Sequence, residues 1–320
     1  MTGEQRPAVP TAVDIREVGP RDGLQIEAPI STAAKRQLLQ ALARTGVRRI
    51  EATAFVSPTA VPAMADAAAV AEVVQEIDAG RAAGSPPISW SALVPNLAGA
   101  RRALAAGFTE LEYVVSAADG HSLANVRRPT ADALAAVAEV AAAAHEAGGR
   151  CEVIVATAWD CPFDGRTPVV RTAELCARAV ELGADRLCLG DTIGTATPGR
   201  VIDLLDAVRA AVPAVDVGAH FHNTRGAGLA CAWAAVTAGV TSLDASTGGL
   251  GGCPFAPGAS GNIATEELAL LLGDSGVDTG IDLDAALAAA GLAEELVGHP
   301  GSSNLLRAGG RSRPRGRPRS

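Results

Sequence analysis

The 320-residue sequence has few aromatic residues and few basic ones, and both deficits narrow the classes of protein that it can encode. Aromatic residues make up only 3% of the chain, Lys35 is its only lysine, and the formal net charge is -8. A nucleic-acid-binding body normally carries a basic face, so we expect no nucleic-acid partner. No apolar run approaches the roughly 20 residues that cross a bilayer, and residues 1–11 lack the apolar stretch of a secretory signal. We therefore expect neither a membrane partner nor secretion.

The cysteines form no CxxC pair and no dense framework, which argues against a disulfide scaffold and a zinc ribbon. With 48% hydrophobic and 19% charged residues, the composition is that of an ordinary globular protein. The simplest interpretation is a cytoplasmic protein with reduced thiols. The six cysteines are Cys151, Cys161, Cys176, Cys188, Cys231 and Cys253.

Eight short apolar, β-branched segments recur between alanine-rich helical stretches. They start roughly 33 residues apart on average, which is the spacing of βα repeats. Eight such units predict an α/β fold, a (β/α)8 TIM barrel. The alternative is a doubly wound open sheet, but the first strand is followed by "EVGPRDGLQ" and not by the GxGxxG turn of that fold. The predicted strands are Asp14–Val18, Arg49–Thr53, Ile88–Val94, Glu110–Ser116, Glu152–Thr157, Arg186–Leu189, Asp216–His220 and Ser242–Ala245.

The domain organisation follows from this spacing. We expect a flexible N-terminus over residues 1–11, the barrel over 12–263, and a C-terminal helical appendage over 264–306. Residues 307–320 contain six arginines and no core-forming residues, which predicts a disordered basic tail. A solvated extension is the simpler interpretation of this tail, and a polyanion-binding segment is the alternative. The clearest helical patterns are Thr32–Arg44, Met64–Ala79, Thr130–Ala147, Thr172–Leu182, Thr265–Leu272 and Leu283–Val297.

Polar residues follow several predicted strands, at the end of the barrel where TIM-barrel enzymes carry their chemistry. The period of two along a strand places His220 and His222 on the same side. Asp22 follows the first strand and Glu51 lies on the second, so two imidazoles and a carboxylate can share one cation. Nitrogen and oxygen ligands of this kind suit Mg²⁺ or Mn²⁺. The alternatives are two histidines satisfied by polar neighbours, and a Glu51 paired structurally with Arg21 or Arg49.

A glycine-rich loop follows the eighth strand and carries Cys253 between four glycines and a proline. Such a position is poor for core packing, whereas a glycine-rich backbone permits close approach to a ligand and the motion of a lid. We therefore expect Cys253 to act at the site, with an exposed thiol as the alternative.

Five segments in this order resemble the 3-hydroxy-3-methylglutaryl-CoA (HMG-CoA) lyase family over about residues 12 to 300. They are "EVGPRDGLQ", "IEATAFVSP", "LGDTIGTATP", "HFHNTRG" and "GGLGGCPFAPGASGN". The resemblance implies a metal-dependent retro-Claisen cleavage of an acyl-CoA substrate, with Mg²⁺ or Mn²⁺ as cofactor and a homo-oligomer, dimer or tetramer, as the assembly. It implies metal ligation by Asp22, His220, His222 and Asn262, catalytic roles for Arg21, Glu51, Asp191, His220 and Cys253, and substrate binding by Arg21, Gln25 and Arg225.

The sequence departs from the animal lyases at several polar positions. Ala54 and Cys188 occupy positions at which the animal lyases typically have serine, and Ile154 lies near the position of a tyrosine in those enzymes. Asn223 and Arg225 replace the Asp and Tyr of their HxHDTYG motif. The five motifs still predict an HMG-CoA lyase, giving acetyl-CoA and acetoacetate, and the departures leave the acyl group open. A paralogous lyase acting on another 3-hydroxyacyl-CoA, such as a citramalyl thioester, and a Claisen-condensing acyltransferase remain as alternatives.

Overall fold

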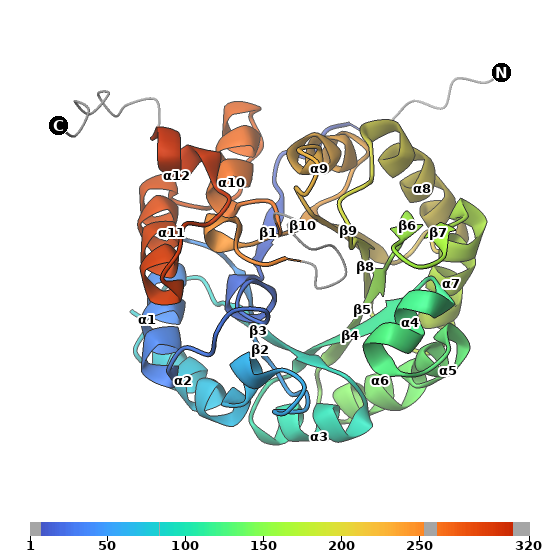
Figure 1. Cartoon of the computed structure of the whole chain (residues 1–320), viewed down its shortest axis with the longest axis horizontal. Coiled ribbons are helices and arrows are strands. Elements are labelled where there is room, and N and C mark those ends of the chain that lie inside the picture. Colours follow the sequence, from blue (N-terminus) through green and yellow to red (C-terminus); the bar gives the residue numbers. More distant parts are fainter. Residues whose placement is uncertain (1–7, 83, 253–260, 310–320) are drawn as a thin grey trace.

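The computed structural model describes residues 8–82, 84–252 and 261–309, and its centre is a closed barrel of eight parallel strands (Figure 1). Around the barrel the strands follow the order β1-β10-β9-β8-β5-β4-β3-β2, and β2 pairs with β1 to close it. The predicted (β/α)8 barrel is confirmed, and the open sheet is wrong. The barrel strands are β1 (Asp14–Glu17), β2 (Arg49–Ala54), β3 (Ser89–Val94), β4 (Glu110–Ser116), β5 (Arg150–Ala156), β8 (Arg186–Asp191), β9 (Asp216–Phe221) and β10 (Ser242–Ala245).

Helices surround the barrel and cover its strands (Figure 1). The predicted helix Thr130–Ala147 is divided in two at Ala136, and a short antiparallel ribbon of β6 (Asp160–Cys161) and β7 (Gly165–Arg166) follows β5. The helices are α1 (Thr32–Leu42), α2 (Ala67–Ala79), α3 (Leu97–Ala105), α4 (Asp119–Val126), α5 (Thr130–Ala135), α6 (Val137–Glu146), α7 (Val169–Glu181), α8 (Pro198–Ala211), α9 (Gly228–Thr237), α10 (Thr265–Asp274), α11 (Leu283–Val297) and α12 (Asn304–Ala308). Single turns are η1 (Gly19–Gly23), η2 (Pro62–Met64) and η3 (Thr247–Gly249).

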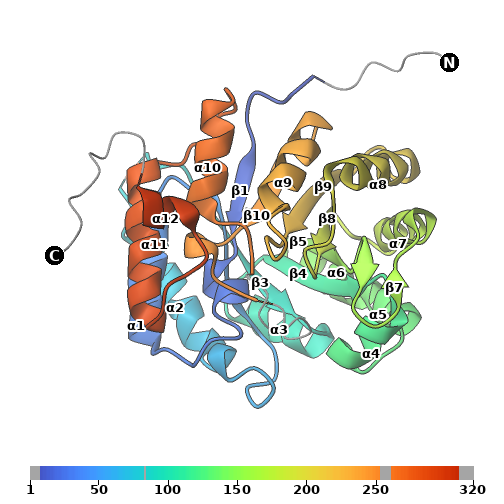
Figure 2. The ribbon, with the colours of Figure 1, turned by 45° about the horizontal axis from the view of Figure 1, so that its top comes forward.

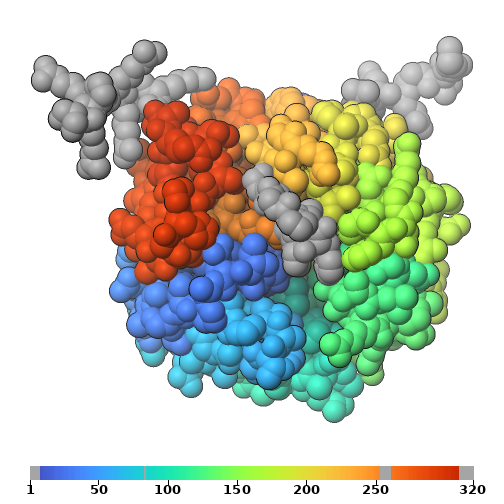
Figure 3. Space-filling model, in the orientation of Figure 1, coloured from blue at the N-terminus to red at the C-terminus, as the bar shows by residue number. Residues whose placement is uncertain are grey.

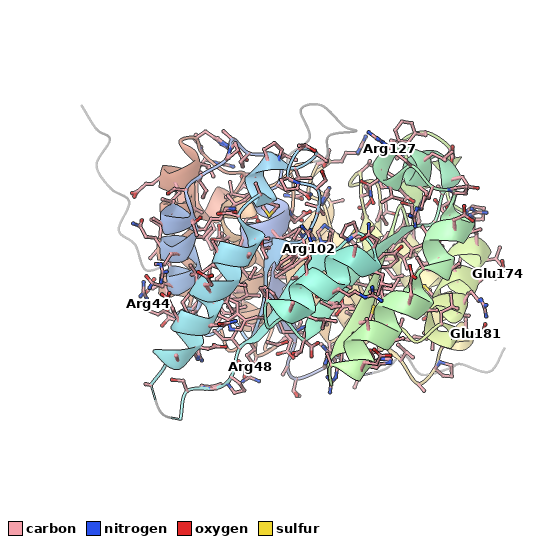
Figure 4. The ribbon with its side chains drawn as sticks, turned by 90° about the horizontal axis from the view of Figure 1, so that it is seen from below. Arg44, Arg48, Arg102, Arg127, Glu174 and Glu181 are labelled. Atoms are coloured by element: carbon pink, nitrogen blue, oxygen red, sulfur yellow. The ribbon has the colours of Figure 1, made fainter. Side chains whose placement is uncertain are left out.

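Helix α7 shows why these segments are helical. Its apolar residues Leu175, Cys176 and Ala179 recur at spacings of one, three and four, and all are buried against the barrel. Glu174 and Glu181 lie on the outer side of the same helix, where both are exposed (Figure 4). This apolar stripe is the pattern of an amphipathic helix that packs on a core through one face.

The barrel strands alternate between two buried layers. Ile15, Ile50 and Leu111 face the surrounding helices and are almost fully buried, so they form the hydrophobic core between wall and helices. On β1 the next residue, Arg16, is also fully buried and contacts the carboxylates of Asp244, Glu112 and Glu152 inside the barrel. The interior of the barrel is therefore filled in part by paired charges, and not by aliphatic side chains alone.

The C-terminal helices complete the molecule. Helix α10 follows the eighth strand, and α11 packs against both α10 and α1. Helix α12 extends through Arg307 and Ala308, two residues into the segment for which we expect disorder, because Arg307 binds the backbone oxygens of Gly301 and Ser302. Residues 310–320 of that tail lie outside the described residues. Among the helices of the described part of the chain, none is long and apolar enough to cross a membrane.

Candidate active site

The first strand delivers two charged residues to the mouth of the barrel, the end at which the strands have their C-termini. A single π-helical turn, η1, widens the chain there, because the amides of Arg21, Asp22 and Gly23 all converge on the carbonyl of Val18. Their N···O distances are 3.1, 2.7 and 3.2 Å. Such turns occur often at functional sites, since they project side chains that a regular helix would not. Both Arg21 and Asp22 are buried.

Arg21 bridges two carboxylates and keeps one donor free. Its Nη1 lies 2.6 Å from Asp22 Oδ1, and its Nη2 lies 2.7 Å from Glu51 Oε2. Its Nε is buried and has no hydrogen-bond partner among the described residues. Glu51 is thus paired with Arg21, as the structural alternative expected, whereas Arg49 pairs with Glu152 at 2.6 Å. Burial raises the pKa of Glu51 even though Arg21 opposes the shift.

His220 and His222 lie on the same side of β9 and the residues that follow it, as the period of two predicts. Their ring centroids are 5.0 Å apart. His220 Nδ1 lies 3.1 Å from Asp244 Oδ2, and this contact raises the pKa of His220 although burial acts to lower it. Burial and the neighbouring His220 lower the pKa of His222 to about 4. His222 is therefore neutral at neutral pH, which is the form that binds metals.

Asn262 reaches the site through the backbone. Its strand-like bridge with His222 places it beside the second histidine, 40 residues earlier in the chain. Its side-chain Nδ2 donates to Asp22 Oδ2 at 2.8 Å and to the Leu250 carbonyl at 3.0 Å. Gly251 lies so close that a Cβ there would be 2.6 Å from Asn262 Nδ2, and its φ of +111° is in the region that favours glycine. The glycine-rich segment thus makes room for the asparagine.

The chemistry of the donor set fits a divalent cation. Asp22, His220 and His222 each offer one ligand atom, and these atoms lie within 4.8 Å of one another. His222 Nδ1 and Asn262 Oδ1 are buried and have no hydrogen-bond partner among the described residues. Unpaired buried acceptors are costly unless something satisfies them, and a cation would do so. Burial acts to raise the pKa of Asp22, but Arg21 and the two histidines outweigh it and lower that pKa, so the carboxylate stays ionised.

Three further predicted site residues already have partners. Gln25 Nε2 donates to Asp22 Oδ1 at 2.7 Å. Asp191 accepts the amides of Thr195 at 2.9 Å and Ala196 at 3.0 Å, and burial raises its pKa. Arg225 donates to the carbonyls of Ile193 and Gly194, in the loop after β8. Cys253 lies outside the described residues, so its place at the site remains a prediction.

Sequence reasoning missed the residue behind the first histidine. Asp244 is buried and contacts both His220 and Arg16. The signal was present, because Arg16 and Asp244 are charged residues inside short apolar strands, where a charge needs a partner. Their pairing spans 228 residues, so only the barrel topology reveals it.

The family model described as HMGL-like matches residues 12–292 of the chain. The chain belongs to this family. A hydroxymethylglutaryl-CoA lyase of Bacillus subtilis, YngG, is 39% identical over 93% of this chain and 97% of its own length. An (R)-citramalyl-CoA lyase of Chloroflexus aurantiacus is 41% identical over 90% of this chain and 92% of its own. A structure of an Acinetobacter baumannii HMG-CoA lyase, in complex with coenzyme A and 3-methylmalate, has a TM-score of 0.86 and 38% identity, covering 96% of this chain and 98% of that one.

These relatives confirm the predicted family and enzyme class, and the HMGL-like chain is a carbon–carbon lyase. They divide on the acyl group. An enzyme named for citramalyl-CoA is as similar to this chain as one named for hydroxymethylglutaryl-CoA. The acyl group of the substrate must therefore be inferred from the residues of the site itself.

Proposed function

We propose that the chain cleaves 3-hydroxy-3-methylglutaryl-CoA to acetyl-CoA and acetoacetate, using Mg²⁺ or Mn²⁺ held by Asp22, His220, His222 and Asn262. The observation that carries this proposal is the convergence of three ligand atoms within 4.8 Å beside two unsatisfied acceptors. The unpaired Arg21 Nε next to them supplies a donor for a substrate oxygen.

The reaction requires three changes in the substrate. The tertiary hydroxyl loses its proton, the C2–C3 bond breaks to give a ketone and a thioester enolate, and the enolate carbon takes up a proton. A bound divalent cation makes the hydroxyl more acidic and favours the oxygen that becomes the ketone. Arg21 lies where its free Nε would stabilise the negative charge that develops on the thioester oxygen.

Two protein groups are needed to move protons. Both nitrogens of His220 are engaged in this proposal, Nδ1 by Asp244 and Nε2 by the cation. We therefore assign the hydroxyl proton to Glu51, the buried carboxylate that contacts Arg21, because its raised pKa brings it closer to neutral pH. Cys253 would then return a proton to the enolate carbon.

Ala54 and Cys188, at the positions where we expect serine in the animal enzymes, support a second candidate for the substrate. Ala54 is buried, and Cys188 is buried with its Sγ 3.6 Å from Asp244 Oδ2. Neither side chain offers the hydroxyl donors that we expect of the animal enzymes. Together with the citramalyl-CoA lyase relative, this supports a smaller or differently charged acyl group as the second candidate.

The decisive experiment measures acetyl-CoA release from HMG-CoA, a citramalyl thioester and other 3-hydroxyacyl-CoA thioesters in the presence of Mn²⁺. Acetoacetate and pyruvate are assayed separately, because they report the two candidate acyl groups. We expect the highest kcat/KM with HMG-CoA. A preference of more than about tenfold for the citramalyl thioester would replace that substrate, and no cleavage of any thioester would overturn the lyase proposal.

We further propose a cytoplasmic location and a homo-oligomeric assembly. The five cysteines among the described residues, Cys151, Cys161, Cys176, Cys188 and Cys231, are buried and unpaired, which suits a reducing compartment. Light scattering of the purified chain tests the expected dimer or tetramer.

A further inference from the structure

Behind the proposed metal site, a buried carboxylate joins a ligand histidine to the charged interior of the barrel. Asp244 on β10 lies between two neighbouring strands, paired in register with Arg16 on β1 and with His220 on β9. The three side chains therefore point inward at one level of the barrel. Register alone brings them together, because parallel neighbours at the same level face the same side.

The contacts of Asp244 use both of its oxygens. Arg16 Nε donates to Oδ1 and Arg16 Nη2 donates to Oδ2, each at 2.8 Å, which is the two-point geometry of a guanidinium and a carboxylate. Oδ2 also lies 3.1 Å from His220 Nδ1. All three residues are buried or nearly so, with Arg16 at 0% and Asp244 at 3% exposure. The carboxylate cannot turn away from His220 without breaking its contacts to Arg16.

This geometry decides which nitrogen of His220 is available. Because Asp244 accepts the proton on Nδ1, Nε2 is left with its lone pair free, on the ring edge away from β10. The ligand atoms of Asp22 and His222 lie within 4.8 Å of the nitrogen that His220 offers. A carboxylate behind a ligand histidine fixes the tautomer and the ring orientation and makes the imidazole a better ligand.

We propose that Asp244, held in place by Arg16, is a positioning residue that presents His220 Nε2 to the divalent cation. The inference rests on the proposed metal site and goes beyond it, because Asp244 and Arg16 are not ligands themselves. The competing account is that Asp244 serves only as a counter-ion for the buried guanidinium. Glu112 and Glu152 also contact Arg16, and no contact joins either of them to His220.

That difference supplies a matched pair of variants. Asp244→Asn and Glu112→Gln each replace a buried carboxyl group that contacts Arg16 by an amide, and each leaves Arg16 with other carboxyl partners. Only Asp244→Asn changes the partner of His220 Nδ1, because it replaces the ionised acceptor by a neutral amide, which accepts more weakly. We expect isothermal titration with MnCl₂ to show Kd raised by about 10- to 100-fold in Asp244→Asn and within about threefold of the parent in Glu112→Gln.

Other outcomes separate the two proposals. If Asp22→Ala binds Mn²⁺ like the parent, the proposed metal site itself is wrong. If Asp22→Ala loses Mn²⁺ while Asp244→Asn keeps the parent Kd, the site stands and the positioning role is overturned. Equal losses in Asp244→Asn and Glu112→Gln would overturn it as well, because a general disturbance of the contacts around Arg16 would then explain both.

A measurement on the unmodified protein does not depend on how the variants fold. In metal-free protein labelled with ¹⁵N-histidine, at a pH where the ring is neutral, the His220 resonances are identified by their loss in His220→Gln. We expect the proton on Nδ1 and none on Nε2. A proton on Nε2 would overturn the assignment.

Discussion

At the scale of single residues, the site is built from charges that have been removed from water and given partners. Arg21 contacts Asp22 and Glu51, and each of the three is buried. Breaking such an arrangement by removing one partner leaves an uncompensated charge, so each substitution tests both stability and chemistry. A test of catalysis must therefore separate rate per folded molecule from the amount of folded protein.

Arg21→Met is the clearest such test. The variant loses the unpaired Nε that we propose for stabilising the developing negative charge, while Asp22, His220 and His222 remain. We expect Mn²⁺ binding to persist and kcat to fall by about 10²-fold or more, as for the loss of an electrostatic donor. The rate is normalised to folded protein by circular dichroism. A kcat within about threefold of the parent would leave Arg21 as a structural partner of Glu51.

The side chains of Ala54 and Cys188 give a second prediction at the scale of single residues. Restoring hydroxyls with Ala54→Ser and Cys188→Ser is expected to raise kcat/KM for HMG-CoA by up to about tenfold, because buried donors recognise an acyl carboxylate. Cys176→Ser is the control, since Cys176 is a buried thiol on the outer helix α7. If the double variant gains nothing and the parent already cleaves HMG-CoA efficiently, the departures at these positions do not define the substrate.

At the scale of elements, the C-terminal segment fastens the loop that leads to the site. Ser302 donates its amide to the Gly248 carbonyl and its hydroxyl to the Gly249 carbonyl, both at 2.9 Å. Just before it, His299 Nε2 lies 2.8 Å from Glu27 Oε2 in the first loop. On the face shown in Figure 3, the red surface of the C-terminal helices adjoins the blue surface of the N-terminal part of the chain. The loops after the first and last strands are thus held by one segment.

Ser302→Ala measures this fastening. Losing one partly buried hydrogen bond to a carbonyl is expected to lower the free energy of unfolding by about 1 kcal/mol. Ser275→Ala is the control, because Ser275 makes a similar bond to the Leu271 carbonyl at 2.7 Å on an exposed helix end. We expect that control to change stability by less than about 0.5 kcal/mol in urea unfolding. Equal effects of the two substitutions would mean that Ser302 adds nothing beyond a surface bond.

The elements also show what a sequence reader can and cannot predict. Strands β4 and β10 and helix α11 have the predicted bounds, because alternation and helical spacing report directly on which face is buried. The π-helical turn η1 and the break at Ala136 were not predicted, because they are local changes of hydrogen-bond register that leave the apolar pattern intact.

The site divides along the same line. Asp22, His220 and His222 were predicted from their places at strand ends, and the structure brings them together. Asn262 came only from the family resemblance, since its backbone bridge to His222 has no local signal. Arg16 and Asp244 were missed although each is a charged residue in a short apolar strand, because their pairing depends on which strands meet when the barrel closes.

At the scale of the whole molecule, closure of the barrel places the first strand of the chain beside the last barrel strand. Strand β1 pairs with β10 on one side and with β2 on the other (Figure 2). Glu17 strengthens the closure: it is fully buried and accepts the amides of Gly19 and Thr247 and the hydroxyl of Thr265. Burial raises its pKa from 4.5 to about 7.

This shift predicts a pH dependence of stability. The folded state binds a proton on Glu17 more tightly than the unfolded state, so the favourable contribution is complete below pH 4.5 and is lost as the pH rises through about 7. The change amounts to about 3 kcal/mol. Between pH 5 and pH 8 we expect the free energy of unfolding of Glu17→Gln to rise relative to that of the parent, because only the parent loses the contribution of a protonated Glu17. Urea titration at each pH measures both. Parallel curves for the two proteins would show that Glu17 does not titrate in this range.

The pairing of the first strand with the last also has a consequence for synthesis. Asp22 is made 198 residues before His220, and its partner Asn262 follows later still, as their numbers show. A growing chain adds roughly 5–20 residues per second, so the first ligand waits on the order of 10–40 s for its partners. During that time β1 lacks its neighbouring strand β10, and Arg16 lacks the carboxylate of Asp244 on that strand. If the proposed metal site is right, metal binding therefore belongs to the end of translation, after nearly the whole chain has been made.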